Sequence, residues 1–251
     1  GLLRERLISI WKKVREKYHS IVIMIDEAES IEKINALTFL REVFQRVDSE
    51  ANYMLVLAGK LNFPERMSES FSPLNRFFPV NKLKKLEKKN VSDYIKKRLK
   101  EVKINIEEEA LTLIFKKSEG HPYVVVSMCY LLFESLKDNE KIITLDVVKR
   151  SMSKIKGRLA QDFFNPMFHP LTPKGKMILC KIAISIEDLK FSFNESQKWT
   201  ALKSHQLSPY ILEMIKKGAI NKPRRGEYEI FHSLFKEYLV GISKEYLNSR
   251  F

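Results

Sequence analysis

The feature that most constrains the fold is a run of five apolar residues at positions 21–25, which stops abruptly at Asp26 and Glu27. Because apolar and polar residues do not alternate in this run, it predicts a strand that is buried on both faces, as in a parallel sheet. A similar run spans residues 53–58 and ends at Gly59. Apolar residues at helical spacing in residues 36–47 lie between the two runs. Strand, helix and strand together predict a β-α-β unit.

Asp26 and Glu27 follow the first predicted strand directly. The carboxyl ends of parallel strands form the edge at which such sheets bind ligands. In phosphoryl-transfer ATPases an Asp at this place helps to hold Mg²⁺, and an adjacent Glu can polarise the attacking water. One carboxylate together with phosphates suffices for Mg²⁺, which prefers hard oxygen ligands. The alternative is a solvated turn or a helix N-cap, since many strands end in this dipeptide.

A short third strand is predicted at residues 77–80, and only helices from residue 90 to about residue 155. Asn90 or Ser92 is the predicted cap of the first of these helices. The acidic run at residues 107–109 suits the positive end of a second helix. The starts of the next two helices are marked by Pro122 in a first turn and by Thr144 as a cap.

Prolines at positions 166, 170 and 173 break any long helix and predict a domain boundary. Beyond it we expect three helices, the third capped by Ser208 with Pro209 in its first turn, and then a hairpin around residues 223–226. A last helix starts near His232. Helix, helix, helix and hairpin is the order of a winged-helix domain, a variant of the helix-turn-helix.

In their order and spacing these segments resemble the AAA+ ATPases. The resemblance is strongest to the archaeal and bacterial branch related to replication-origin initiators and to STAND signalling ATPases. Residues 21–27 resemble the Walker B strand, and residues 53–59 the sensor-1 strand. Residues 71–80 resemble the segment that carries the arginine finger and the fifth strand. Residues 82–157 resemble the helical lid, with a Gly-x-Pro-like motif at residues 118–123.

The resemblance implies a role for each matching residue. Asp26 would hold Mg²⁺ through water, and Glu27 would orient the attacking water. Arg76 would be the arginine finger that reaches the γ-phosphate of a neighbouring subunit, which implies a homo-oligomer; the alternative is a surface arginine that caps a strand. Lys60 or Asn62 stands where sensor 1 has a polar residue. The residues expected to border the nucleotide are Asn62, His121 and Pro122, of which the last two are alternatively only a helix start.

The phosphate-binding P-loop, Gly-x-x-x-x-Gly-Lys-Ser/Thr, is absent from the sequence. We therefore expect no ATP or Mg²⁺ on this chain alone and no ATPase activity, whereas the full protein would use both. The resemblance implies an N-terminally truncated piece whose missing P-loop strand belongs beside residues 53–58. The sheet should then show a gap or a rearranged edge with exposed apolar surface.

Lys and Arg number 45 against 31 Asp and Glu, a net charge of +14. This excess suits an anionic partner, most simply a nucleic acid such as DNA; on charge alone a solvated surface without a specific partner is an equal alternative. Glu213 on the presumed recognition helix weighs against tight DNA contact, and contact with a protein is the alternative use of a winged helix. The predicted DNA-binding residues are Lys203, Lys216, Lys217, Lys222, Arg224 and Arg225.

The predicted fold class is α/β followed by an all-α lid and a winged helix. Its domains are a partial AAA+ core at residues 1–81, a lid at 82–157 and a winged helix at 158–251. The predicted function is an ATPase that couples hydrolysis to conformational switching or assembly; the alternatives are a non-enzymatic DNA-binding module and a signalling regulator that contacts protein. Two cysteines without a disulfide pattern suit a cytoplasmic location, and no apolar run is long enough to cross a membrane. Frequent Lys and Ile are compatible with an archaeal source.

Overall fold

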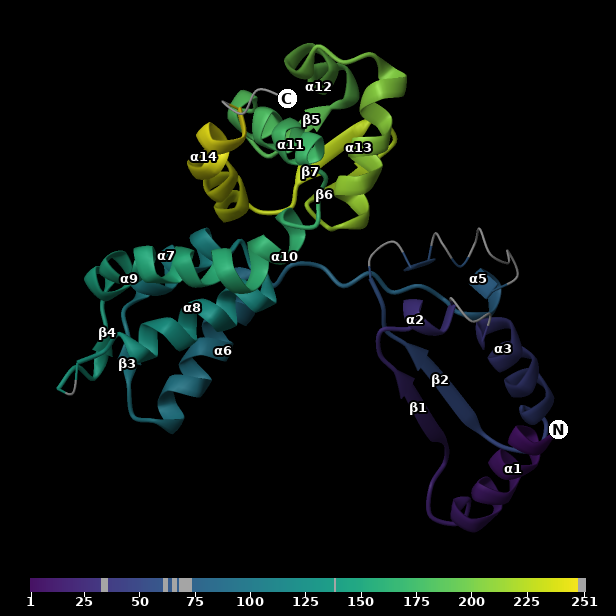
Figure 1. The fold of residues 1–251 in the computed structure, drawn as a ribbon. Helices are drawn as coiled ribbons and strands as arrows, with labels where there is room; N and C mark the ends of the chain where they lie inside the picture. The colour runs from purple at the N-terminus through teal and green to yellow at the C-terminus, as the bar shows by residue number, and fades with distance from the viewer. Residues whose placement is uncertain (33–35, 61–62, 65–66, 68–73, 138, 248–251) are drawn as a thin grey trace. The chain divides into compact units, whose positions relative to one another are not determined.

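A computed structural model describes residues 1–32, 36–60, 63–64, 67, 74–137 and 139–247. The chain divides into two compact units, Gly1–Lys84 and Lys85–Phe251 (Figure 1). The finer division at residues 81 and 157 remains a prediction. None of the described helices combines the length and the apolar character that a bilayer crossing requires.

The first unit is built on a parallel pair of strands, β1 (Ile21–Ile25) and β2 (Tyr53–Leu57), as predicted. One face of this pair is covered by apolar side chains of the first and third helices, among them Leu7, Phe44 and Val47. The helices of this unit are α1 (Leu2–Val14), α2 (Glu29–Glu32), α3 (Ala36–Val47) and α5 (Leu74–Phe77).

The opposite face of the sheet is open. Val22, Met24, Met54 and Val56 point to that face, and Met24 is 76% exposed. The prediction of strands buried on both faces is therefore wrong, because the described helices cover one face only. The expectation of exposed apolar surface on this sheet is confirmed.

The prediction of a strand at residues 77–80 is also wrong. The last helix of the unit, α5, ends at Phe77, and the residues after it form no strand. Pro79 has no N–H to donate to a ladder, which disfavours a strand here. The rings of Phe77 and Phe78 meet edge to face at 4.9 Å, and buried Phe78 packs with Phe63 and Met67.

The second unit is mainly helical, with small sheets. The pair β3–β4 is parallel, and β5, β7 and β6 form an antiparallel sheet in that order. The strands are β3 (Asn105–Ile106), β4 (Ile142–Ile143), β5 (Lys190–Ser192), β6 (Ile220–Arg224) and β7 (Glu227–Ile230). The helices are α6 (Lys88–Glu101), α7 (Glu108–Ser118), α8 (Pro122–Glu134), α9 (Leu145–Leu159), α10 (Asn165–Phe168), α11 (Pro173–Ser185), α12 (Phe193–Thr200), α13 (Ser204–Lys216) and α14 (Ser233–Leu247).

Local sequence signals placed some helix starts correctly and others not. Pro122 opens α8, and the Thr144 hydroxyl accepts from the Val147 N–H at the start of α9. Asn90 and Ser92 are not caps, because α6 begins earlier, at Lys88. Ser208 is not a cap either.

The helix that contains Ser208 begins four residues earlier, at Ser204, so Pro209 lies inside α13. The side chain of Gln206 accepts the backbone N–H of Lys203 at 3.0 Å and so caps this earlier start. Leu207 is fully buried on the inner face of the helix. Burial of this residue offsets the one hydrogen bond that a proline costs.

The loss of helical structure predicted between Gly157 and Pro173 does not occur in the first half of that segment. The chain stays helical through a π-helical turn at Ala160–Phe164 and through α10. Pro166 stands in the first turn of α10, directly after the π-helical turn. Phe164 and Phe168 are completely buried, and the Phe164 ring lies 5.4 Å from that of Phe235. These aromatic side chains make one continuous core of the second unit.

Candidate functional site

The carboxyl ends of β1 and β2 lie side by side, as their sequences predicted. Ile25 is opposite Leu57 in the register, and the Ala58 N–H donates to the Ile25 carbonyl at 2.9 Å. The Ala28 N–H in turn donates to the Ala58 carbonyl at 2.9 Å. Two short polar segments, one after each strand, are thus tied together at this edge.

Asp26 and Glu27 are exposed at this edge. Glu27 has a left-handed backbone with φ of 51°, and its N–H donates to the Asp26 Oδ1 at 2.9 Å. A non-glycine residue in this conformation costs free energy, and such residues cluster at functional sites. The turn directs the two carboxylates to solvent at the ends of the strands, where a ligand has access to them.

Glu29 completes the site and was missed by the sequence analysis. It is buried, and its carboxylate binds Lys60 twice: Oε1 lies 3.3 Å from the Lys60 Nζ, and Oε2 accepts the Lys60 N–H at 3.4 Å. Burial raises the pKa of Glu29, but the hydrogen bonds from its own backbone and from Lys60 outweigh burial and leave the pKa below its usual value. Gly59 lies against this carboxylate, since a Cβ there would be 3.0 Å from Oε2.

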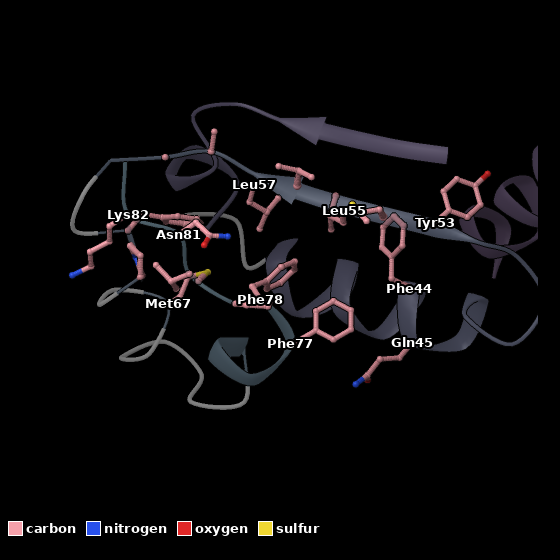
Figure 2. Close-up of a pocket in the computed structure, with 18 of the residues that line it drawn as sticks. Phe44, Gln45, Tyr53, Leu55, Leu57, Met67, Phe77, Phe78, Asn81 and Lys82 are labelled. Carbon is pink, nitrogen blue, oxygen red and sulfur yellow. The ribbon is translucent and has the colours of Figure 1, made fainter. Parts of the chain in front are cut away.

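The outer edge of β2 is open along a groove of about 1090 Å³ (Figure 2). The Asn52 carbonyl and the Ala58 N–H both bond to β1. Because backbone direction alternates along a strand, the N–H and C=O groups of Tyr53, Leu55 and Leu57 point to the other side. Among the residues that the structure describes, no strand pairs with that side.

The groove is lined mainly by apolar side chains of β2, of α3 and of the segment after α5. Phe44, Leu55, Leu57, Phe77 and Phe78 line it (Figure 2). A row of unpaired backbone groups beside apolar side chains has the chemistry that accepts an added strand.

The other residues that were predicted to contact a nucleotide do not all belong to one unit. Arg76 is exposed in the last turn of α5, so it lies on a helix and caps no strand. Asn62 lies outside the described residues. His121 and Pro122 belong to the second unit, where they begin α8.

His121 lies beside a second histidine that the sequence analysis did not single out. His232 is completely buried; its Nε2 donates to the Ser118 carbonyl at 3.0 Å, and its Nδ1 accepts from the Leu234 N–H at 3.1 Å. The carboxylate of Glu119 is 3.8 Å from the same Nδ1, which has no proton to share with it in this arrangement. Glu119 instead accepts from the Ser233 N–H at 2.8 Å and pairs with Lys85 at 2.7 Å.

Both histidines are held neutral, which predicts acid sensitivity. Burial, with His232 and Lys85 nearby, lowers the pKa of His121 to about 4, and burial lowers the pKa of His232. The unfolded chain therefore binds more protons than the folded chain below pH 6.5. We expect the free energy of unfolding to fall by about 1–3 kcal/mol from pH 7 to pH 5.

Urea titrations at several pH values, followed by the fluorescence of Trp199 in a Trp11→Phe background, measure this fall. His121→Phe keeps a ring against Phe163 (5.3 Å between centroids) and should flatten the pH dependence, whereas His205→Gln, on an exposed residue, should not. Equal slopes for all three proteins would contradict the assignment.

The predicted DNA-binding residues are all exposed. Within the described part of the chain, no ion pair engages any of these six cations. Lys216 and Lys217 end α13, and Lys222, Arg224 and Arg225 lie on β6 and in the turn that follows. Glu213 is half-buried, and its carboxylate accepts the Thr172 N–H at 2.8 Å, so it is engaged within the protein.

Asp26 fits Mg²⁺ as a single carboxylate ligand, with the remaining positions left to water and phosphate oxygens. Among the described residues, no three His, Cys, Asp or Glu side chains gather into a complete metal site. Asp26 and Glu27 thus present two exposed carboxylates at the strand ends, and the sequence contains no Gly-x-x-x-x-Gly-Lys-Ser/Thr segment to cradle phosphates.

No protein-family model matches the chain, and no curated protein matches it significantly. Among solved structures, a Walker-type ATPase of Pyrococcus abyssi matches with a TM-score of 0.62 at 14% identity, over 94% of this chain and 66% of that chain. A mutant form of RuvB of Thermotoga maritima matches with a TM-score of 0.49 at 18% identity, over 94% and 74% of the two chains. The RuvB likeness is too distant to carry an argument.

The first match shows likeness of fold: over most of its length the chain shares the fold of part of the Pyrococcus protein, and the expected resemblance to P-loop ATPases is confirmed at the level of the fold. The chain spans just under two thirds of the length of the Pyrococcus protein.

Proposed function

We propose that this chain is the part of an AAA+/STAND-like ATPase that runs from the Walker B strand through the lid and the winged helix. The open edge of β2 carries the proposal. It presents the backbone groups of Tyr53, Leu55 and Leu57 beside a groove of about 1090 Å³. One more parallel strand in that groove would end beside the carboxyl end of β2, one strand away from Asp26 and Glu27, and a P-loop after it would bring phosphates to the edge that carries these carboxylates.

In the whole protein, ATP and Mg²⁺ would supply the electrophilic phosphorus and the charge that neutralises the leaving group. Asp26 would hold the metal through water, and Glu27 would accept a proton from the attacking water. Lys60, held by Glu29, would stand at the end of the adjacent strand. Arg76 would reach a nucleotide of a neighbouring subunit, and Asn62, His121 and Pro122 would border the bound nucleotide. Hydrolysis would drive switching or assembly.

The test compares this chain with a longer chain that is read in frame from upstream of the Gly1 codon. With Mg²⁺, the longer chain should bind a fluorescent ATP analogue and hydrolyse ATP, and the 251-residue chain should do neither. An upstream frame without a P-loop, or a folded longer chain that does not bind ATP, would overturn the proposal.

DNA binding by the C-terminal residues is a second candidate. The order of α11, α12 and α13 followed by the β6–β7 hairpin supports a winged helix, and its turn carries Arg224 and Arg225 without ion pairs among the described residues. Cations on a wing reach phosphates and give affinity that depends on salt. Contact with a protein, as in a signalling regulator, is the third candidate. It is favoured by Pro209 and by Leu212, which is 55% exposed on the outer face of α13.

Charge reversal separates these two candidates. Arg224→Glu with Arg225→Glu should weaken binding to duplex DNA about tenfold or more at about 50 mM salt and make it less salt-dependent. Fluorescence anisotropy measures both quantities. Unchanged DNA binding by the folded double variant would exclude Arg224 and Arg225 as DNA contacts and would favour protein contact as the use of the wing.

A further inference from the structure

The first helix of the second unit, α6, has two contrasting faces. Val91, Ile95 and Leu99 are buried against the helices beside it. The rest of α6 is strongly basic, with six Lys or Arg and two acidic residues over Lys88–Glu101. Packing therefore fixes which side of α6 meets solvent, and that side carries the charge.

Four lysines form one stripe along this solvent side. Helical geometry places residues seven and eleven apart on the same face, and Lys97 borders that line. The stripe is about 16 Å long at 1.5 Å per residue. All four are exposed. We define the basic stripe as Lys89, Lys96, Lys97 and Lys100.

Three of the four charges are available to a ligand. Lys96 pairs with Glu108 at the start of α7. In the part of the chain that the structure describes, Lys89, Lys97 and Lys100 have no ion pair. Asp93 is the one acidic side chain inside the stripe. Such a row of unpaired like charges costs repulsion that an anionic partner would relieve.

We propose that the basic stripe of α6 binds the phosphate backbone of duplex DNA without reading its sequence. Lysine is a mobile point charge that suits phosphates, and it lacks the fixed fork of donors with which arginine recognises a base edge. This surface is distinct from the predicted wing residues and does not depend on ATP hydrolysis.

The same helix argues against other anionic partners. A membrane-surface helix needs a free apolar face to enter the lipid, and the apolar face of α6 is already buried in the protein core. Single-stranded nucleic acid is held by stacking on open aromatic rings. The nearest exposed ring, Tyr94, has the Arg98 guanidinium 5.8 Å from its centroid and is already engaged.

The test measures the affinity of the 251-residue chain for a fluorescent duplex of about 30 base pairs and arbitrary sequence, between about 50 and 300 mM NaCl. Lys89→Gln, Lys97→Gln and Lys100→Gln combined should weaken binding about tenfold or more at the lowest salt. The slope of log K against log salt should fall by about 2–3, at about 0.9 per lost phosphate contact. Asp93→Asn should tighten binding.

The matched control removes the same charge elsewhere: Lys12→Gln, Lys149→Gln and Lys244→Gln lie on α1, α9 and α14, and all three lysines are exposed. This control should keep most of the affinity and slope. Equal losses in control and stripe variants would overturn the proposal, because net charge alone would then explain binding. So would unchanged binding in the stripe variant, no binding by the parent chain at the lowest salt, or a stripe effect on vesicles of phosphatidylserine and phosphatidylcholine but not on DNA.

Discussion

Gly120→Ala should destabilise the second unit by about 3–5 kcal/mol, within the range of severe single substitutions. Gly120 has φ of +68°, where a side chain is already strained. A Cβ would also lie inside van der Waals contact with the Leu86 carbonyl oxygen and 3.0 Å from its carbon. These are backbone atoms, held by the hydrogen bond from the Leu86 N–H to the Gly120 carbonyl at 2.8 Å, so no side-chain rotation relieves the clash.

Urea unfolding followed by Trp199 fluorescence, in the same Trp11→Phe background, measures this loss of unfolding free energy. The control is Gly157→Ala in the last turn of α9, where a Cβ meets no atom within 4 Å. Replacing a helical glycine that has no close neighbours by alanine should raise the free energy of unfolding by up to about 1 kcal/mol. A loss below about 1 kcal/mol for Gly120→Ala would mean that the segment from Leu86 to Gly120 rearranges freely.

Glu27→Gln in the longer chain should lower the rate of ATP hydrolysis about 100- to 1000-fold and leave ATP binding nearly unchanged. A glutamine keeps the size of the side chain but cannot take a proton from water, and a positioned base contributes about that factor. Steady-state phosphate release and nucleotide binding, measured on the same samples, separate the two effects.

Glu42→Gln, on the exposed face of α3, removes the same charge away from the strand ends and should retain full activity. Activity of Glu27→Gln within a factor of about three of the parent would show that Glu27 is not the base. The strained turn that it occupies would then serve only to place Asp26.

Local signals located the elements along the chain but did not reveal their surroundings. The strands at residues 21–25 and 53–57 followed from uninterrupted apolar runs, and the Thr144 cap from one side chain next to one N–H. Whether both faces of a strand are covered depends on which other elements pack against the sheet. The sequence of the strand itself does not show this. For this reason Met24 was predicted to be buried and is exposed.

The same reasoning explains the residues that were missed. Glu29 meets Lys60, 31 positions along the chain, and His232 meets Ser118, 114 positions away. Each side chain is ordinary by itself, and only the fold brings the pairs together. Glu213 is a similar case: it was expected on the reading face of a recognition helix, and the fold brings its carboxylate to the Thr172 N–H, 41 positions away.

The bare face and open edge of the β1–β2 sheet make the stability of the first unit conditional. A molecule that binds this surface only when the unit is folded adds RT ln(1 + [L]/Kd) to its free energy of unfolding, about 2.7 kcal/mol at a hundredfold excess over Kd. The melting temperature of this unit therefore rises with the concentration of such a molecule. The size of this rise in melting temperature therefore measures how well an added strand fits beside Tyr53, Leu55 and Leu57.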